Sequence, residues 1–207
     1  MMSDKNDAIF SFLLIGIPIS INVDDKISNN NRYENFDALI YTDGRGIKIY
    51  GNVKNINTLF EIYGADKILK HELEHILLNH IEREKEIIDN IKDYSKNDLS
   101  TLFNIAADYI INKDLDIGTT KFKNFQLVNE EIMKTKFNLT SKDLDKKSVE
   151  EILKMMLKNN PPMKISEIIK EIKKLLKGDG FGGTSSFSHV SPNKIDEFDD
   201  FIDKNAK

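Results

Sequence analysis

An amphipathic pattern fills residues 57–92 and requires a helix with one buried face. Apolar residues recur there at steps of three and four, and charged residues occupy the opposite face, which is the period of an α-helix. The apolar positions are Ile68, Leu69, Leu73, Ile76, Leu77 and Ile81. Because no glycine or proline follows His75 within this segment, we expect one continuous helix to its end.

This predicted helix contains the sequence HELEH at residues 71–75. Residues four apart share a helix face, with Cβ atoms about 5–6 Å apart, so the imidazoles of His71 and His75 can chelate one zinc ion. Glu72 lies beside His71, where a carboxylate can take a proton from water that zinc has acidified. We therefore predict His71 and His75 as ligands of one Zn²⁺ and Glu72 as the catalytic base, with Glu74 on the solvated side. The alternative is two ordinary helix histidines without a metal.

A catalytic zinc site needs a third protein ligand and an open position. In residues 104–112, NIAADYIIN, the polar residues Asn104, Asp108 and Asn112 recur at four-residue steps on one face of an otherwise apolar segment. Buried polar groups need partners, and Asp108 is the only ionisable member of this row. We predict Asp108 as the third ligand, with Asn104 and Asn112 orienting ligands through hydrogen bonds. In the alternative, Asp108 accepts a hydrogen bond from a zinc-bound histidine and the third ligand comes from elsewhere.

His80 is the nearest further histidine, but on a straight helix it lies about 140° around the axis from His75. We expect it to face away from the metal and to have a packing or supporting role. Catalysis of this kind also needs a donor to the developing oxyanion. The candidates are Arg83, Tyr109 and His189, although His189 lies in a glycine- and serine-rich stretch typical of a loop.

The first part of the chain predicts a small amount of β-structure. Two β-rich runs, 38–42 and 46–51, flank an Asp-Gly turn and indicate a hairpin, whose second strand could offer its edge to an extended peptide. The polar residues 24–36 should form a loop. The apolar run 9–23 is broken by serine, glycine and proline and is too short for a membrane helix, so we expect a buried helix-to-strand element.

The second part of the chain reads as further helices, which makes the expected class α+β, mostly helical with a hairpin before the HExxH helix. Helices should run from Asn97 or Asp98 to about Asn112, from a capping box at Ser148 and Glu151, and over 165–176. A polar region with a loop near 118–120 separates the first two. We predict one domain over 1–177, followed by a Gly/Ser-rich linker and acidic tail over 178–207.

Composition narrows the functional classes. The chain has no cysteine, which excludes disulfides, thiolate metal sites and a cysteine nucleophile. Its formal net charge is −4, with both signs interleaved, and this pattern disfavours nucleic acid as a partner because phosphate binding requires a concentrated basic surface. We expect a cytoplasmic protein that acts on a peptide or protein and not on a membrane or nucleic acid.

Several ordered motifs resemble a family of bacterial and phage HExxH zinc metallopeptidases, in which a zincin domain often precedes a von Willebrand factor A-like domain. The motifs are YTDGRGIKIY (41–50), HELEHILLNHIER (71–83), NIAADYIIN (104–112) and KSVEEILKMML (147–157), and the resemblance covers roughly residues 8–176. It implies a zincin-like hydrolase with His71, His75 and Asp108 at the metal and Glu72 as base. It also implies that His80 and Arg83 matter.

Two departures from that family stand out. Asn79 replaces a usual glycine, a change we expect to matter little on a helix surface. The sequence also ends where the A-like domain would begin, so functions that depend on that domain are not expected of it. The rival interpretation is a non-catalytic scaffold or interaction module with a structural zinc, which would need a fourth protein ligand such as His80 or His189.

Overall fold

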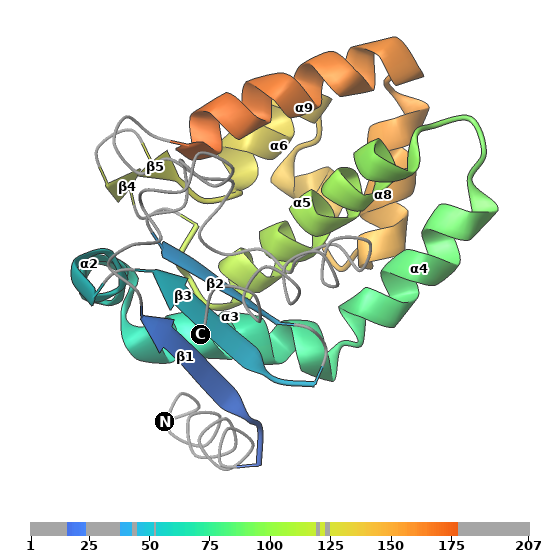
Figure 1. The fold of residues 1–207 in the computed structure, drawn as a ribbon. Coiled ribbons are helices and arrows are strands. Elements are labelled where there is room, and N and C mark those ends of the chain that lie inside the picture. The colour runs from blue at the N-terminus through green and yellow to red at the C-terminus, as the bar shows by residue number, and fades with distance from the viewer. Residues whose placement is uncertain are drawn as a thin grey trace.

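The computed structural model describes residues 16–23, 38–42, 45–51, 53–118, 121–122 and 125–177. Within these ranges the chain is mostly helical with a small sheet, so the predicted α+β class is confirmed (Figure 1). No helix among them combines the length and apolar character needed to cross a bilayer. The expected loop at 24–36, the linker and tail at 178–207 and His189 lie outside the described residues, and the domain boundary stays a prediction.

Three strands form a mixed sheet in the order β1-β3-β2. They are β1 (Ile19–Val23), β2 (Ala38–Thr42) and β3 (Ile47–Gly51). Strands β2 and β3 pair antiparallel, which confirms the hairpin, and β1 pairs parallel with β3. Strand β3, which was predicted to offer its edge to a peptide, is therefore the central strand of this sheet and is paired on both sides. The prediction that the first strand is buried was also wrong, because Ile19 and Ile21 on the edge strand β1 are 40% and 61% exposed.

The helix expected over 57–92 is in fact three helices. They are α2 (Val53–Tyr63), α3 (Ala65–Leu77) and α4 (His80–Asn90). Gly64, with φ of 85°, separates the first two, and Asn79, at φ 52° and ψ 41°, separates the last two. The Asn79 amide donates to the Ile76 carbonyl to close α3, and the Asn79 carbonyl accepts from Arg83 to open α4. A left-handed residue ends a helix as a breaker would, and asparagine tolerates this conformation better than most residues.

The later helices follow the predicted signals more closely. Helix α5 (Lys96–Asp114) begins slightly earlier than expected because Ser95 caps it, accepting from the Asp98 amide. Helix α8 (Val149–Lys158) has the predicted capping box of Ser148 and Glu151, and α9 (Pro162–Lys177) follows. The region between α5 and α8, expected to be mixed and polar, also holds short elements. They are β4 (Lys121–Phe122), β5 (Phe125–Gln126), α6 (Glu130–Phe137) and α7 (Ser141–Leu144).

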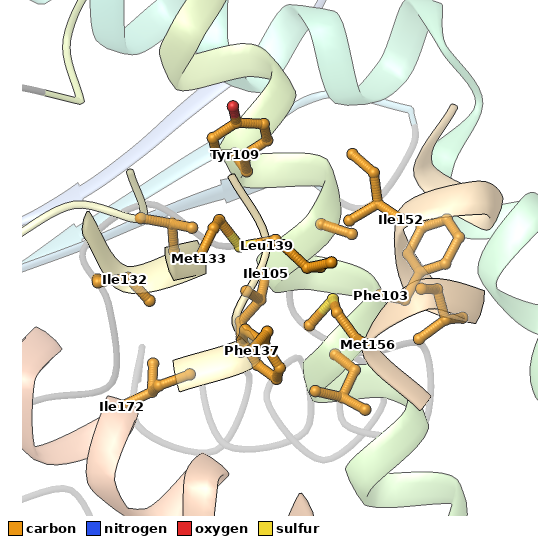
Figure 2. Close-up of a cluster of buried hydrophobic side chains, with 14 of the residues drawn as sticks. Phe103, Ile105, Tyr109, Ile132, Met133, Phe137, Leu139, Ile152, Met156 and Ile172 are labelled. Atoms are coloured by element: carbon orange, nitrogen blue, oxygen red, sulfur yellow. The ribbon is translucent and has the colours of Figure 1, made fainter. Parts of the chain in front are cut away.

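Two apolar clusters hold these elements together. The sheet cluster contains Ile40, Ile47, Ile49, Ile56, Tyr63, Ile68, Ile117 and Leu127, where α2 and α3 cover the sheet. The helical cluster joins α5, α6, α8 and α9, and its larger members include Phe103, Phe137, Ile152, Met156 and Ile172 (Figure 2). Helix α3 packs against both the sheet and α5, so the α3–α5 seam lies between the two clusters.

The left-handed turn at Asn79 generates a first prediction. Replacing Asn79 with alanine should lower the free energy of unfolding by about 1 kcal/mol, because a Cβ without a local hydrogen-bonding group disfavours positive φ, whereas glycine should be neutral or stabilising. The matched control is Asn57→Ala on the exposed surface of α2, which should be neutral or slightly stabilising because alanine is the better helix former. Urea unfolding measures all three. Equal effects of alanine at both positions would show that the turn does not constrain the fold.

Candidate metal centre

Three predicted ligands meet at the α3–α5 seam. Nε2 of His71 lies 3.1 Å from Nε2 of His75, and Oδ1 of Asp108 lies 3.2 Å from Nε2 of His75 and 3.6 Å from Nε2 of His71. Zinc bonds of about 2.0–2.1 Å at tetrahedral angles place neighbouring ligand atoms about 3.3–3.4 Å apart. The observed separations bracket that value. Within the described ranges, this buried trio is a group whose donor atoms could hold one metal ion.

The local sequence explains why these groups converge. Residues 71 and 75 are one turn apart on α3, and the apolar residues Ile68 and Leu73 of that helix are fully buried. On α5, Asp108 is only 4% exposed, while Ala106 and Ala107 lie in the helical cluster. Helix α5 is thus packed by apolar neighbours, with its one buried carboxylate turned toward the histidine pair. The donor set of two imidazoles and one carboxylate suits zinc.

The two buried carboxyl groups of the seam have opposite pKa shifts. Burial would raise the pKa of Asp108, but hydrogen bonds and positive charge from His71 and His75 lower it to about 2. Burial raises the pKa of Glu72 well above its usual range, the nearby Asp108 charge adds to this, and a main-chain hydrogen bond with Thr42 opposes it. Asp108 therefore keeps its charge readily, whereas Glu72 ionises only when something offsets its burial.

Thr42 contacts the site but was not assigned to it from sequence. Thr42 ends strand β2, is completely buried and donates through Oγ1 to the Gly46 carbonyl at 2.7 Å. Its approach to Glu72 depends on the packing of β2 on α3, a long-range contact that carries no local signal.

The expectation that Glu74 is solvated is wrong, because its side chain is partly buried. This burial, with the charge of Asp114 nearby, raises the pKa of Glu74 to about 7.

His80 faces the site, whereas the straight helix predicted from sequence would have turned it away. The break at Asn79 brings its Nδ1 within 3.0 Å of Nδ1 of His75, and the two rings stand at 74° with centroids 5.1 Å apart. His80 is fully buried, with the Phe103 ring packed edge-on at 6.0 Å. Its Nδ1 therefore contacts the nitrogen of His75 opposite the one that faces Asp108.

Arg83, the next candidate on α4, ties helices together. Its Nε and Nη2 donate to the two carboxylate oxygens of Glu150 on α8 at 2.7 and 2.8 Å, and Nη1 donates to the Leu78 carbonyl at 3.0 Å. Through these three contacts the guanidinium holds the turn between α3 and α4 against α8. The arrangement gives Arg83 a structural role and leaves it poorly suited as an oxyanion donor.

The remaining predicted residues occupy different surroundings. Tyr109 lies in the helical cluster, where burial and the charges of Glu130 and Asp145 raise its pKa (Figure 2). Asn112 is buried and its Nδ2 donates to the Val128 carbonyl at 3.0 Å, which fastens the segment after α5. Asn104 is half-buried, one helical turn before Asp108.

Fold and site together define a buried histidine–histidine–carboxylate centre on two packed helices, the kind of donor set that holds a catalytic transition metal. The chain belongs to the family described as "Putative metallopeptidase domain", whose sequence profile matches residues 41–188. This range includes all three candidate ligands and Glu72. Comparisons with curated proteins and with solved structures found no match.

Removing the Asp108 carboxylate should abolish tight metal binding. We expect Asp108→Asn, which keeps the side-chain shape, to lose more affinity than the roughly 10–100-fold typical of losing a supporting group. Glu74→Gln, on the same helix as the histidines but outside the trio, serves as the control and should bind like the wild type. Chelator competition after purification without an affinity tag measures both. Unchanged affinity in the Asp108 variant would remove it from the site.

The Arg83–Glu150 pair gives a stability prediction. Glu150→Gln should lower the free energy of unfolding by about 1 kcal/mol because it removes a partly buried bidentate ion pair. Glu82→Gln is the control: it also lies in the first turn of a helix and pairs with a lysine, but at an exposed surface, so its effect should be a few tenths of that.

The same pair has a defined pH dependence. Burial alone would raise the Glu150 pKa, but a main-chain hydrogen bond and Arg83 hold it below the ordinary value of 4.5. Because the pKa is lower in the folded than in the unfolded protein, the ionised pair stabilises the fold fully above the unfolded-state pKa. This stabilisation is lost as pH falls from there through the folded-state pKa. Urea unfolding of wild type and Glu150→Gln should therefore converge in acid; a constant difference at every pH would contradict the assignment.

Proposed function

We propose that this chain is a zinc-dependent peptidase with a zincin-like fold, in which His71, His75 and Asp108 hold the ion and Glu72 is the general base. The observation that carries the proposal is the convergence of three buried donors at separations suited to one tetrahedral ion, beside a fully buried carboxyl group. Three protein ligands leave one position for the reaction, as catalytic zinc sites require. The family to which the chain belongs points the same way.

A zinc ion at this centre would supply Lewis acidity, which makes water more acidic and polarises a carbonyl. Glu72 accepts the proton of the attacking water and delivers it to the leaving amine. The burial that raises the Glu72 pKa is offset when positive charge lies beside it, so the carboxylate form is favoured in the loaded site. Asp108 would stay ionised as a ligand and would not compete for that proton, because the charge of the ion would favour its carboxylate form, as the flanking histidines do in the metal-free site.

The proposed substrate is an extended peptide lying along the sheet. In the described part of the chain, β3 is flanked on both sides, whereas β2 borders the sheet and ends at Thr42, which hydrogen-bonds toward Glu72. Main-chain pairing with β2 would bring a peptide bond to the catalytic carboxylate and tolerate varied side chains. The net charge of −4 supports a protein over a nucleic acid substrate.

The alternative function is a non-catalytic scaffold in which zinc is structural. Structural zinc sites use four protein ligands. The nearest further histidine, His80, contacts the Nδ1 of His75 and not the nitrogen that faces Asp108, so it does not supply a fourth donor in this arrangement. A scaffold would therefore require a ligand from beyond the described residues.

Glu72→Gln separates the two functions. Wild type and variant should each bind about one zinc per chain, while hydrolysis of unfolded casein should fall by about 10²–10⁴-fold in the variant, because the amide cannot accept a proton. Glu74→Gln is the matched control and should keep activity. Zinc in every protein with activity in none would favour the scaffold. Absence of zinc from the wild type would sink the proposal.

A further inference from the structure

We propose that His80 is the positioning residue for the metal ligand His75. This inference rests on the proposed function, because it concerns how the same centre is held. The evidence is the Nδ1–Nδ1 contact of 3.0 Å between two buried imidazoles, His80 being 0% and His75 1% exposed. A buried ring nitrogen at this distance forms a hydrogen bond that fixes the ring rotation of its partner.

Proton counting assigns the direction of this hydrogen bond. Two facing ring nitrogens share one proton, and a histidine that ligates through Nε2 as neutral imidazole carries its proton on Nδ1. His75 therefore donates from Nδ1, and Nδ1 of His80 accepts. The bond selects the tautomer of His75 that directs an unprotonated Nε2 toward Asp108 and His71.

The surrounding structure holds His80 in place for this role. The left-handed Asn79 turns the chain between α3 and α4, so that His80 returns toward the helix that carries His75. Phe103 packs edge-on against its ring, and Arg83 binds both the Leu78 carbonyl at the turn and Glu150 on α8. Rotation of the His80 ring out of line would break packing in a fully buried position.

A neutral acceptor also suits the charge of this centre. Metal-binding histidines commonly donate to a carboxylate, but here Asp108 and Glu72 are already buried close together, and the Asp108 charge raises the Glu72 pKa. Glu84, one turn after His80 on α4, is a further fully buried carboxyl group, so a carboxylate at position 80 would add repulsion to all of them. An imidazole at position 80 supplies the acceptor without adding negative charge.

Two variants separate hydrogen bonding from packing. His80→Phe preserves ring volume but removes the acceptor, whereas His80→Asn is smaller yet places an amide oxygen near the position of Nδ1. Metal affinity is measured by chelator competition for Zn²⁺ and by the visible absorption of bound Co²⁺, on the full chain. The stability of each metal-free protein is measured by urea unfolding.

The acceptor role predicts that His80→Phe binds Zn²⁺ about 10–100-fold more weakly than wild type and that His80→Asn recovers most of this loss. It also predicts an altered Co²⁺ spectrum for the phenylalanine variant alone. The inference is overturned if His80→Phe binds like wild type, or if affinity follows metal-free stability, with phenylalanine better than asparagine. Failure of the wild type to bind any metal would instead overturn the proposed function itself.

Discussion

The Asp108 carboxylate is buried between two imidazoles, and the rest of the site depends on that contact. A buried charge without partners is strongly destabilising, so the α3–α5 seam can close only while His71 and His75 face it. Breaking the trio from either side would leave uncompensated polar groups at the centre of the domain. The same constraint that shapes a metal site therefore also fixes how two helices pack.

Apolar packing on both sides fixes the position of this α3–α5 interface. The sheet cluster places α3, and the helical cluster places α5, so the relative position of the three donor residues follows from two apolar clusters that contain none of them. The turn at Asn79 and the Arg83–Glu150 pair then fix α4 against both α3 and α8. The contact of His80 with His75 is thus a consequence of helix packing away from the trio of His71, His75 and Asp108.

Local patterns predicted much of this arrangement, and long-range contacts account for what they missed. Spacing of four along single helices was enough to select His71, His75 and Asp108, since the relevant geometry lies within each helix. The role of Asn79 escaped because asparagine is a weak breaker whose conformation is decided by its surroundings. Thr42 and Glu150 meet the site region only through tertiary packing, so no spacing in the sequence identifies them.

The opposite pKa shifts of Asp108 and Glu72 explain how one seam can hold two carboxyl groups with separate tasks. Asp108 gains its charge from the histidines that flank it, and this charge then disfavours ionisation of Glu72. A divalent cation held by the three donors would reverse that balance, because its charge would offset that of Asp108 and attract the Glu72 carboxylate. Occupancy of the centre and ionisation of Glu72 would consequently be linked, because an ion held by the three donors would also favour the carboxylate form of Glu72, the form that can accept a proton from water.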